Sequence, residues 1–286
     1  MPDVERNPYK DEQGAPKLRL SVAAFIDFLG YTEYIEDAFQ KPGRGEKELM
    51  RLRGALDVAY NYLKEKSNQK PDGGPLDFQV RTFTDNLIIG CPIPEREDSF
   101  WPRTIIESVI DYIGYVQAQL ARDGYFIRGA ISVGELYIDE DIVFGPALME
   151  AHRAERDLAV FPRVILCASA EEPFLERDEN RKVFDVLVDS DQRVFIDYLE
   201  NTVMIAYPDD RPFTEFLEGH KAAVMANLKK FAEKPYIRAK YEWAATYHNT
   251  FCDNHTDLFG DDHKIPHTLL ASRPRFWIPN PSETEQ

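Results

Sequence analysis

The sequence predicts an α+β fold in which helices cover an antiparallel-rich sheet. Short apolar runs that end at glycine, proline or turn residues indicate strands. Stripes of apolar residues at steps of three and four indicate amphipathic helices. The core order that results is strand, helix, helix, strand, strand, helix, strand, strand, helix.

The first predicted strand runs from about Leu18 to Phe28 and stops at Gly30, because this apolar run is too short for a helix of its own. A helix is expected from about Tyr31, followed by a break at Lys41–Glu46. A second helix then carries the apolar stripe Leu49, Leu52, Leu56, Ala59 and Leu63.

Two short strands are predicted next, with Phe78, Val80 and Phe83 in one and residues 87–89 in the other. The tight turn between them contains Thr84, Asp85 and Asn86, which makes this segment a hairpin by residue type. Another helix follows, ends at Gly124, and carries the stripe Ile105, Ile106, Val109, Ile110, Ile113, Val116 and Leu120.

The region after Gly124 is predicted to contain a strand to Val133, a bend at Gly134 and a short strand through Val143. A helix opens at Gly145-Pro146, since proline is favoured in the first helical turn. Later elements are an apolar strand at 163–169, strands at 183–188 and 193–198, and helices at 212–231 and 236–254, before a polar, proline-rich tail.

The composition narrows the classes of function. With 34 Lys and Arg against 50 Asp and Glu, the net charge is −16, which disfavours nucleic acid and membrane surfaces as partners. Only three cysteines occur, there is no secretory leader, and no apolar run reaches a membrane-spanning length, so we expect a soluble, cytoplasmic protein. A phosphate-handling function would need local cations.

Two aspartates stand in otherwise apolar surroundings. Asp27 lies inside the run 23–29, and burying an unpaired carboxylate costs several kcal/mol, so it needs a cation or several donors, unless it caps the following turn. Asp85 lies in the hairpin turn, where aspartate is also an ordinary turn residue. If the two strands are neighbours, both carboxylates project from one end of the sheet and could share hard cations.

Further candidates surround these aspartates. The helix start after Phe28 offers free N–H groups that suit a polyphosphate. Arg153 could stabilise a phosphoryl group or pair with Glu150, Glu155 or Asp157 on its own helix, and Arg81 and Arg128 in strands could support either role. His248, Cys252 and His255 recur at helical steps, but their aromatic neighbours favour a packed helix face over a zinc site.

Three segments of the sequence resemble motifs of a known family. FIDFLGYT resembles the first metal motif of class III nucleotidyl cyclases, RTFTDNLIIG their second metal-aspartate hairpin, and VFGPALMEAHRAE the helix with their transition-state arginine. RGAISVGELYIDEDIVFGPALMEAHRAE and the late KYEWAATYHNTFC are most similar to the bacterial pyrimidine cyclases of Pycsar anti-phage defence. The resemblance covers roughly residues 18–254 and implies a class III cyclase-like (ferredoxin-like) fold with a C-terminal strand and helix extension.

The resemblance also implies roles for individual residues. Asp27 and Asp85 would bind two Mn²⁺ or Mg²⁺ ions per active site, with the Ile26 carbonyl as an auxiliary ligand, and Arg153 would stabilise the transition state. The triphosphate would be cradled by Phe28, Leu29, Gly30, Tyr31 and Thr32.

Three positions depart from the purine cyclases. Gln79 stands where they have a base-reading lysine, Ile142 where they have an aspartate, with Asp141 displaced by one residue, and Met149 where they usually have an asparagine. The first two departures argue against adenine recognition. Tyr34 and Arg81 are candidates to fill the space beside a smaller base.

The implied activity is conversion of UTP, or CTP, to the 3′,5′-cyclic monophosphate and pyrophosphate, giving a second messenger in antiviral defence. The family implies a homodimer with active sites at the subunit interface and a separate effector that senses the cyclic nucleotide. The alternatives are a purine cyclase and a degenerate cyclase fold that senses nucleotides without catalysis. The expected division is a flexible N-terminus (1–16), a catalytic domain (17–171), a C-terminal extension (172–260) and a polar tail (261–286).

Overall fold

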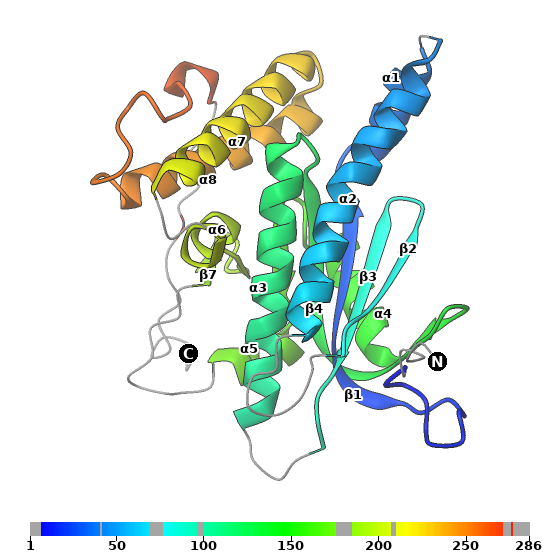
Figure 1. Ribbon diagram of the computed structural model, residues 1–286. Coiled ribbons are helices and arrows are strands. Elements are labelled where there is room, and N and C mark those ends of the chain that lie inside the picture. Colours follow the sequence, from blue (N-terminus) through cyan, green and yellow to red (C-terminus); the bar gives the residue numbers. More distant parts are fainter. Residues whose placement is uncertain are drawn as a thin grey trace.

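An eight-stranded sheet organises the chain (Figure 1). The structure is a computed structural model that describes residues 7–40, 42–68, 77–95, 100–175, 185–206, 210–270 and 276. Neighbouring strands lie in the order β2-β3-β1-β4-β6-β8-β7, with β5 paired to β4, and every pair is antiparallel except β4 with β6. The strands are β1 (Arg19–Phe28), β2 (Gln79–Phe83), β3 (Asn86–Pro92), β4 (Ile127–Ile138), β5 (Val143–Phe144), β6 (Val164–Leu166), β7 (Val186–Val188) and β8 (Val194–Ile196).

Helices lie on both faces of this sheet. The helices are α1 (Tyr31–Phe39), α2 (Arg44–Asn68), α3 (Phe100–Arg122), α4 (Pro146–Asp157), α5 (Ala168–Leu175), α6 (Tyr198–Ala206), α7 (Asp210–Lys230), α8 (Pro235–Asn254) and a short 3₁₀ helix, His267–Leu269. Helix α3 packs with α2, α6 and α7 in the large core, whereas α4 packs on β1 and β4.

The predicted α+β class is confirmed. Strands β1, β2, β3 and β4, with α1 and α2 after the first and α3 before the last, form the strand–helix–strand–strand–helix–strand unit of ferredoxin-like folds. Strands β7 and β8 continue the same sheet beyond β6. The C-terminal part therefore adds strands to the sheet as well as the helices α6 to α8.

Alternation along β1 decides which side chains face α4. Val22, Ala24 and Ile26 are buried in the large core, while Ala23 belongs to a second apolar cluster with Tyr9 and Ala147 of α4. Because successive side chains of a strand point to opposite faces, Asp27 lies on the same face as Ala23. This smaller face carries the candidate site.

The structure differs from the expected elements in several places. The bend expected at Gly134 is wrong, because β4 continues unbroken to Ile138. A Cβ at Gly134 would lie 3.4 Å from that of Ala147, so this glycine instead lets α4 approach the sheet closely. Helix α2 begins at Arg44, inside the expected break, and Leu49 of the expected stripe is 66% exposed.

Helices α5 and α6 were not expected, since α5 follows directly on a strand and contains a proline, Pro173, that usually ends helices. Within the N-terminal segment, Tyr9 is fully buried and its hydroxyl lies 3.0 Å from the Ser21 Oγ. Residues 183–184 of the strand expected at 183–188, and most of the expected tail after residue 270, fall outside the described residues. Among the helices that the structure describes, none is both long and apolar enough to cross a bilayer.

Candidate functional site

Asp27 and Asp85 come together at one end of the sheet. Asp27 is the last residue but one of β1 and lies opposite Asn86 of β3, and the Phe28 N–H donates to the Asp85 carbonyl at 3.1 Å. Thr84, with a φ of 54°, provides the tight turn that brings Asp85 beside β1. Burial raises the pKa of the Asp27 carboxyl above its usual range, and the neighbouring Asp85 carboxylate adds to this rise.

A partly buried ion-pair network supports Asp27 from the neighbouring strand and helix. Arg128 of β4 donates through Nε to Asp27 Oδ2 at 3.0 Å, and its Nη2 lies 2.7 Å from Glu155 Oε1. Glu155 is on the inner side of α4 and only 4% exposed, and this burial raises its pKa. We call these four residues, Asp27, Asp85, Arg128 and Glu155, the acid corner.

The acid corner suits a hard cation. Arg128 already supplies one partner for Asp27, which meets the requirement that a buried carboxylate be compensated. Asp85 has no such cation among the described residues, and its side chain accepts hydrogen bonds from the adjacent Thr84 and Asn86 at 2.8 and 3.3 Å. Mg²⁺ typically binds one or two carboxylates together with water and substrate phosphates. Asp27 and Asp85 can supply the carboxylates of such a set.

The described residues do not form a complete protein cage for a metal. Across the described parts of the chain, no three His, Cys, Asp or Glu side chains gather as a metal-binding group. Ile26, the predicted auxiliary ligand, lies next to Asp27 in the ladder opposite Leu87 and Gly129. The remaining ligands would therefore have to come from the main chain, from water or from a bound phosphate.

Only part of the predicted phosphate cradle has main-chain N–H groups left for an anion. Two of its N–H groups are used inside the protein, since Phe28 donates to Asp85 and Leu29 donates to the Phe126 carbonyl at 2.8 Å. Gly30 adopts the left-handed conformation, with φ 74°, as the N-cap of α1. The first N–H groups of a helix have no partner within it, so Tyr31 and Thr32 are the part of the cradle that can face an anion.

Arg153 lies on the opposite side of α4 from the acid corner. The three acids that might pair with it are engaged elsewhere: Glu150 accepts from Ser169, Glu155 binds Arg128, and Asp157 binds Arg156. Arg153 is exposed and has no hydrogen bond or ion pair to any residue in the described ranges. Met149, one turn earlier, is 47% exposed.

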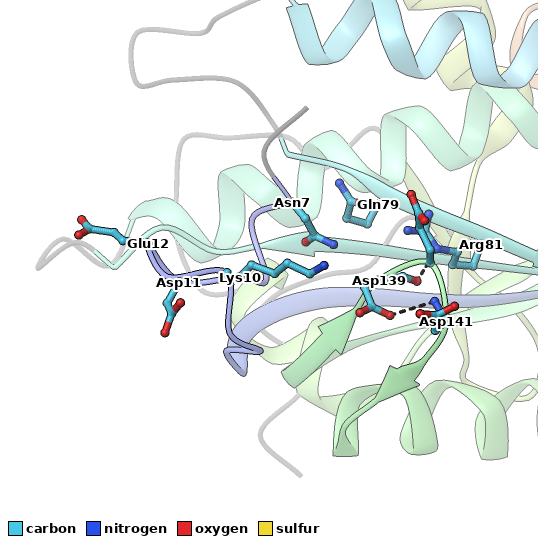
Figure 2. Close-up of a pocket in the computed structure, with 10 residues that line it drawn as sticks. Asn7, Lys10, Asp11, Glu12, Gln79, Arg81, Asp139 and Asp141 are labelled. Carbon is cyan, nitrogen blue, oxygen red and sulfur yellow. Dashed lines mark hydrogen bonds between the residues drawn. The ribbon is translucent and has the colours of Figure 1, made fainter. Parts of the chain in front are cut away.

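Gln79 and Arg81, two of the residues predicted to lie near the base, line a separate cleft of about 820 Å³ (Figure 2). Gln79 and Arg81 extend from β2, and Asp139 and Asp141 come from the turn after β4. Arg81 is fixed by donating through Nε to the Asp139 carbonyl at 2.5 Å, and Asp139 Oδ1 accepts from the Asp141 N–H at 3.0 Å. The N-terminal segment closes the other side with Asn7, Lys10, Asp11, Glu12 and Gly14.

Some of the residues predicted to contact the base line this cleft, and others do not. The displaced Asp141 lines it with Gln79, whereas Ile142 is 52% exposed and does not. Tyr34 is not brought to this cleft. Its hydroxyl bonds Glu48 Oε2 at 2.7 Å and the Tyr125 hydroxyl at 2.6 Å, beside a second cavity of about 440 Å³.

The histidines of α8 have structural partners. His248 lies 3.0 Å from His220 between their Nδ1 atoms, and His255 pairs with Glu200 at 3.1 Å. Cys252 is fully buried. These contacts agree with the packed helix face that the aromatic neighbours predict.

Sequence reasoning did not predict the position of Glu155 or of helix α8 relative to the site. Glu155 appeared only as a possible surface partner of Arg153, although its spacing from the buried Ala147 and Ala151 could have placed it on the inner side. Lys240 and Tyr241 of α8 lie near Asp27 and Gly30, and no local signal connects such distant segments.

No family model and no curated protein matches the chain. Among solved structures it is similar to the catalytic core of a rhodopsin-guanylyl cyclase with converted specificity in complex with ATPαS. The TM-score is 0.43 at 12% identity, over 63% of this chain and 96% of that one.

Two further similar structures come from bacteria. A class III adenylyl cyclase-like ATP-binding protein from Pseudomonas aeruginosa gives a TM-score of 0.41 at 12% identity, over 66% of this chain and 41% of that one. An adenylate/guanylate cyclase/hydrolase from Silicibacter pomeroyi gives 0.37 at 15% identity, over 63% and 95%. At these values the similarity concerns the general fold, and neither family membership nor a ligand follows from it for this chain.

Proposed function

We propose that this protein is a nucleotide cyclase of the class III type, and that its substrate is a pyrimidine nucleoside triphosphate, UTP before CTP. The observation that carries the proposal is the meeting of Asp27 and Asp85 at one end of the sheet, beside the start of α1. Two carboxylates next to free helical N–H groups are the donors that a metal-bound triphosphate requires.

The proposed reaction is cyclisation within one nucleotide. The ribose 3′-oxygen attacks the α-phosphorus and loses its proton to water, and the bond from that phosphorus to the oxygen bridging to the β-phosphate breaks, releasing pyrophosphate. When bound by Asp27 and Asp85, Mg²⁺ or Mn²⁺ supplies positive charge that favours the ionised 3′-oxygen and neutralises the phosphates.

The chain's own residues have separate tasks in this scheme. Tyr31 and Thr32 donate main-chain N–H groups to the triphosphate, and Arg128 holds the Asp27 carboxylate in place. Arg153 donates to charge that develops on the α-phosphoryl group of the neighbouring subunit's nucleotide in a homodimer. Catalysis of this kind depends on positioning and charge.

The cleft lined by Gln79 and Arg81 is the proposed base-binding region. Glutamine and arginine side chains with the nearby Asp141 offer donors and acceptors to a pyrimidine edge. Met149 would contact the nucleotide only from the exposed side of α4. The role in antiviral defence and the separate effector that senses the product belong to this proposal and rest on the resemblance of the motifs.

Incubation of the purified protein with Mn²⁺ and each of the four nucleoside triphosphates, followed by mass spectrometry of the products, tests the proposal. We expect cyclic UMP as the main product, with cyclic CMP second. Cyclic AMP as the main product would refute the pyrimidine substrate. Metal-dependent nucleotide binding without any cyclic product would favour the alternative, a cyclase fold that senses nucleotides without catalysis. The Arg128–Asp27 pair is compatible with that function.

A further inference from the structure

Helix α8 of the C-terminal part reaches the same end of the sheet as the acid corner. Tyr241 is buried, and its ring lies 5.3 Å from that of Phe126, the residue whose carbonyl fixes the Leu29 N–H. The Tyr241 hydroxyl would lie 4.0 Å from a Cβ at Gly30, and Glu33 Oε2 would lie 3.9 Å from it. The helix therefore borders the loop that begins α1.

Lys240, the residue before Tyr241, is a cation of this region that forms no ion pair with the described residues. It is half-buried, and its ammonium has no hydrogen bond or ion pair to any residue that the structure describes. Its Nζ lies over the ring of Tyr236, 4.9 Å from the ring centroid. Arg128, by contrast, is held by two carboxylates.

The charges around Lys240 are those of the candidate site. It is attracted by Asp27, Glu33 and Glu155 and repelled by Arg128. Burial, with the repulsion from Arg128, lowers the pKa of Lys240. A lysine that is partly removed from water yet forms no close ion pair retains donors for an incoming anion.

We propose that Lys240 is a phosphate-binding residue of the same subunit, which donates to the terminal phosphates of a nucleoside triphosphate held at Asp27 and at the start of α1. This inference rests on the proposed function. It assigns a task to the C-terminal extension, which would complete the phosphate site in addition to widening the sheet. The Lys240 ammonium also offsets the repulsion that the Glu33 carboxylate presents to a phosphate near Gly30.

Calorimetry with Mn²⁺ and UTP or UMP on the full chain tests the assignment. Lys240→Met keeps the apolar stem and removes the charge, Lys240→Arg keeps the charge, and Lys229→Met removes an exposed lysine of α7 as a matched control. We expect Lys240→Met to weaken UTP binding at least about tenfold and UMP binding less than about twofold, because a charged hydrogen bond to the terminal phosphates is lost. Lys240→Arg should retain most of the UTP affinity, and Lys229→Met should match the unmodified protein.

Mn²⁺ affinity without nucleotide separates a phosphate ligand from a structural lysine. Lys240→Met should bind Mn²⁺ as tightly as the unmodified protein or more tightly, since a neighbouring positive charge has been removed. Equal losses for UTP, UMP and Mn²⁺ would overturn the assignment in favour of a structural role, and unchanged UTP binding would overturn it outright. Failure of the unmodified protein to bind any nucleoside triphosphate would instead reject the proposed function and this inference with it.

Discussion

The two sides of helix α4 contrast in how their charges are satisfied. On the inner side, Ala147, Ala151 and Glu155 are buried, and Glu155 joins Arg128 and Asp27 in a network within one chain. On the outer side, Met149 and Arg153 are exposed, and Arg153 has no hydrogen bond or ion pair within the described ranges.

This contrast bears on how a complete site could be assembled. Arg153 precedes Glu155 by two residues, which is roughly 200° around a helix, so its side chain leaves α4 on nearly the opposite side from the acid corner. One subunit therefore keeps its carboxylates and its free arginine apart. A second copy that presents its own α4 to the acid corner would bring the two together, as in the proposed homodimer.

The largest effect is expected from the inner side. Asp27→Asn keeps the shape of the side chain and a hydrogen bond for Arg128 but removes the charge, so we expect turnover to fall by about 10³-fold or more. Asp157→Asn makes the same charge change at an exposed position and should alter turnover less than about twofold. Steady-state kinetics on the nucleotide that proves to be the substrate measures both. An Asp27→Asn protein with more than a tenth of the original rate would contradict the proposed role of Asp27.

Loss of Arg153 on the outer side of α4 should lower activity almost as much as loss of Asp27, without lowering stability. We expect Arg153→Ala to lower turnover by about 10²- to 10³-fold, because a donor to developing phosphoryl charge is lost. The melting temperature should not change, since Arg153 has no hydrogen bond or ion pair to lose among the described residues. Arg156→Ala, which breaks only the exposed pair with Asp157, is the matched control.

Mixing the two inactive proteins tests whether the sides come from different subunits. Random pairing of Asp27→Asn with Arg153→Ala makes half of the dimers mixed, each with one intact site, which should restore about a quarter of the original activity. No recovery above the single variants after dissociation and reassociation would reject the shared site.

The sequence predicted the two aspartates of the candidate site better than the residues that pack around them. Asp27 and Asp85 could be foreseen because a carboxylate inside an apolar run is a local anomaly and a hairpin turn has a local residue code. Their meeting follows from strand pairing, and the structure aligns Asp27 with Asn86 as neighbouring strands require.

What could not be predicted depends on contacts between distant segments. The burial of Tyr9 and the approach of Lys240 to Asp27 join parts of the chain that no periodicity relates. Gly134 illustrates the other limit, since a glycine that permits close packing of α4 has the same local pattern as one that bends a strand. Tyr34 is a sequence candidate for the space beside the base, yet its hydroxyl is held by Glu48 and Tyr125.

The next effect is on stability, and it should be larger for the inner ion pair Arg128–Glu155 than for the exposed pair Arg156–Asp157. Glu155→Gln removes the buried partner of Arg128, and we expect the free energy of unfolding to fall by about 1–3 kcal/mol. Arg156→Gln, which breaks an exposed pair, should change it by less than about 0.5 kcal/mol. Urea unfolding followed by circular dichroism gives both values. Equal changes would mean that the two sides of α4 do not differ energetically.

The smallest effect should come from the apolar part of the outer side. Met149 and Leu258 are almost equally exposed, at 47% and 46%, but only Met149 lies beside Arg153. If this side meets a second copy, Met149→Gln should raise the dimer dissociation constant by about three- to tenfold, because an apolar side chain buried in the dimer is replaced by a polar one. Leu258→Gln should leave that constant unchanged. Sedimentation velocity over a range of protein concentrations measures it, and equal behaviour of the two variants would place the dimer contact away from α4.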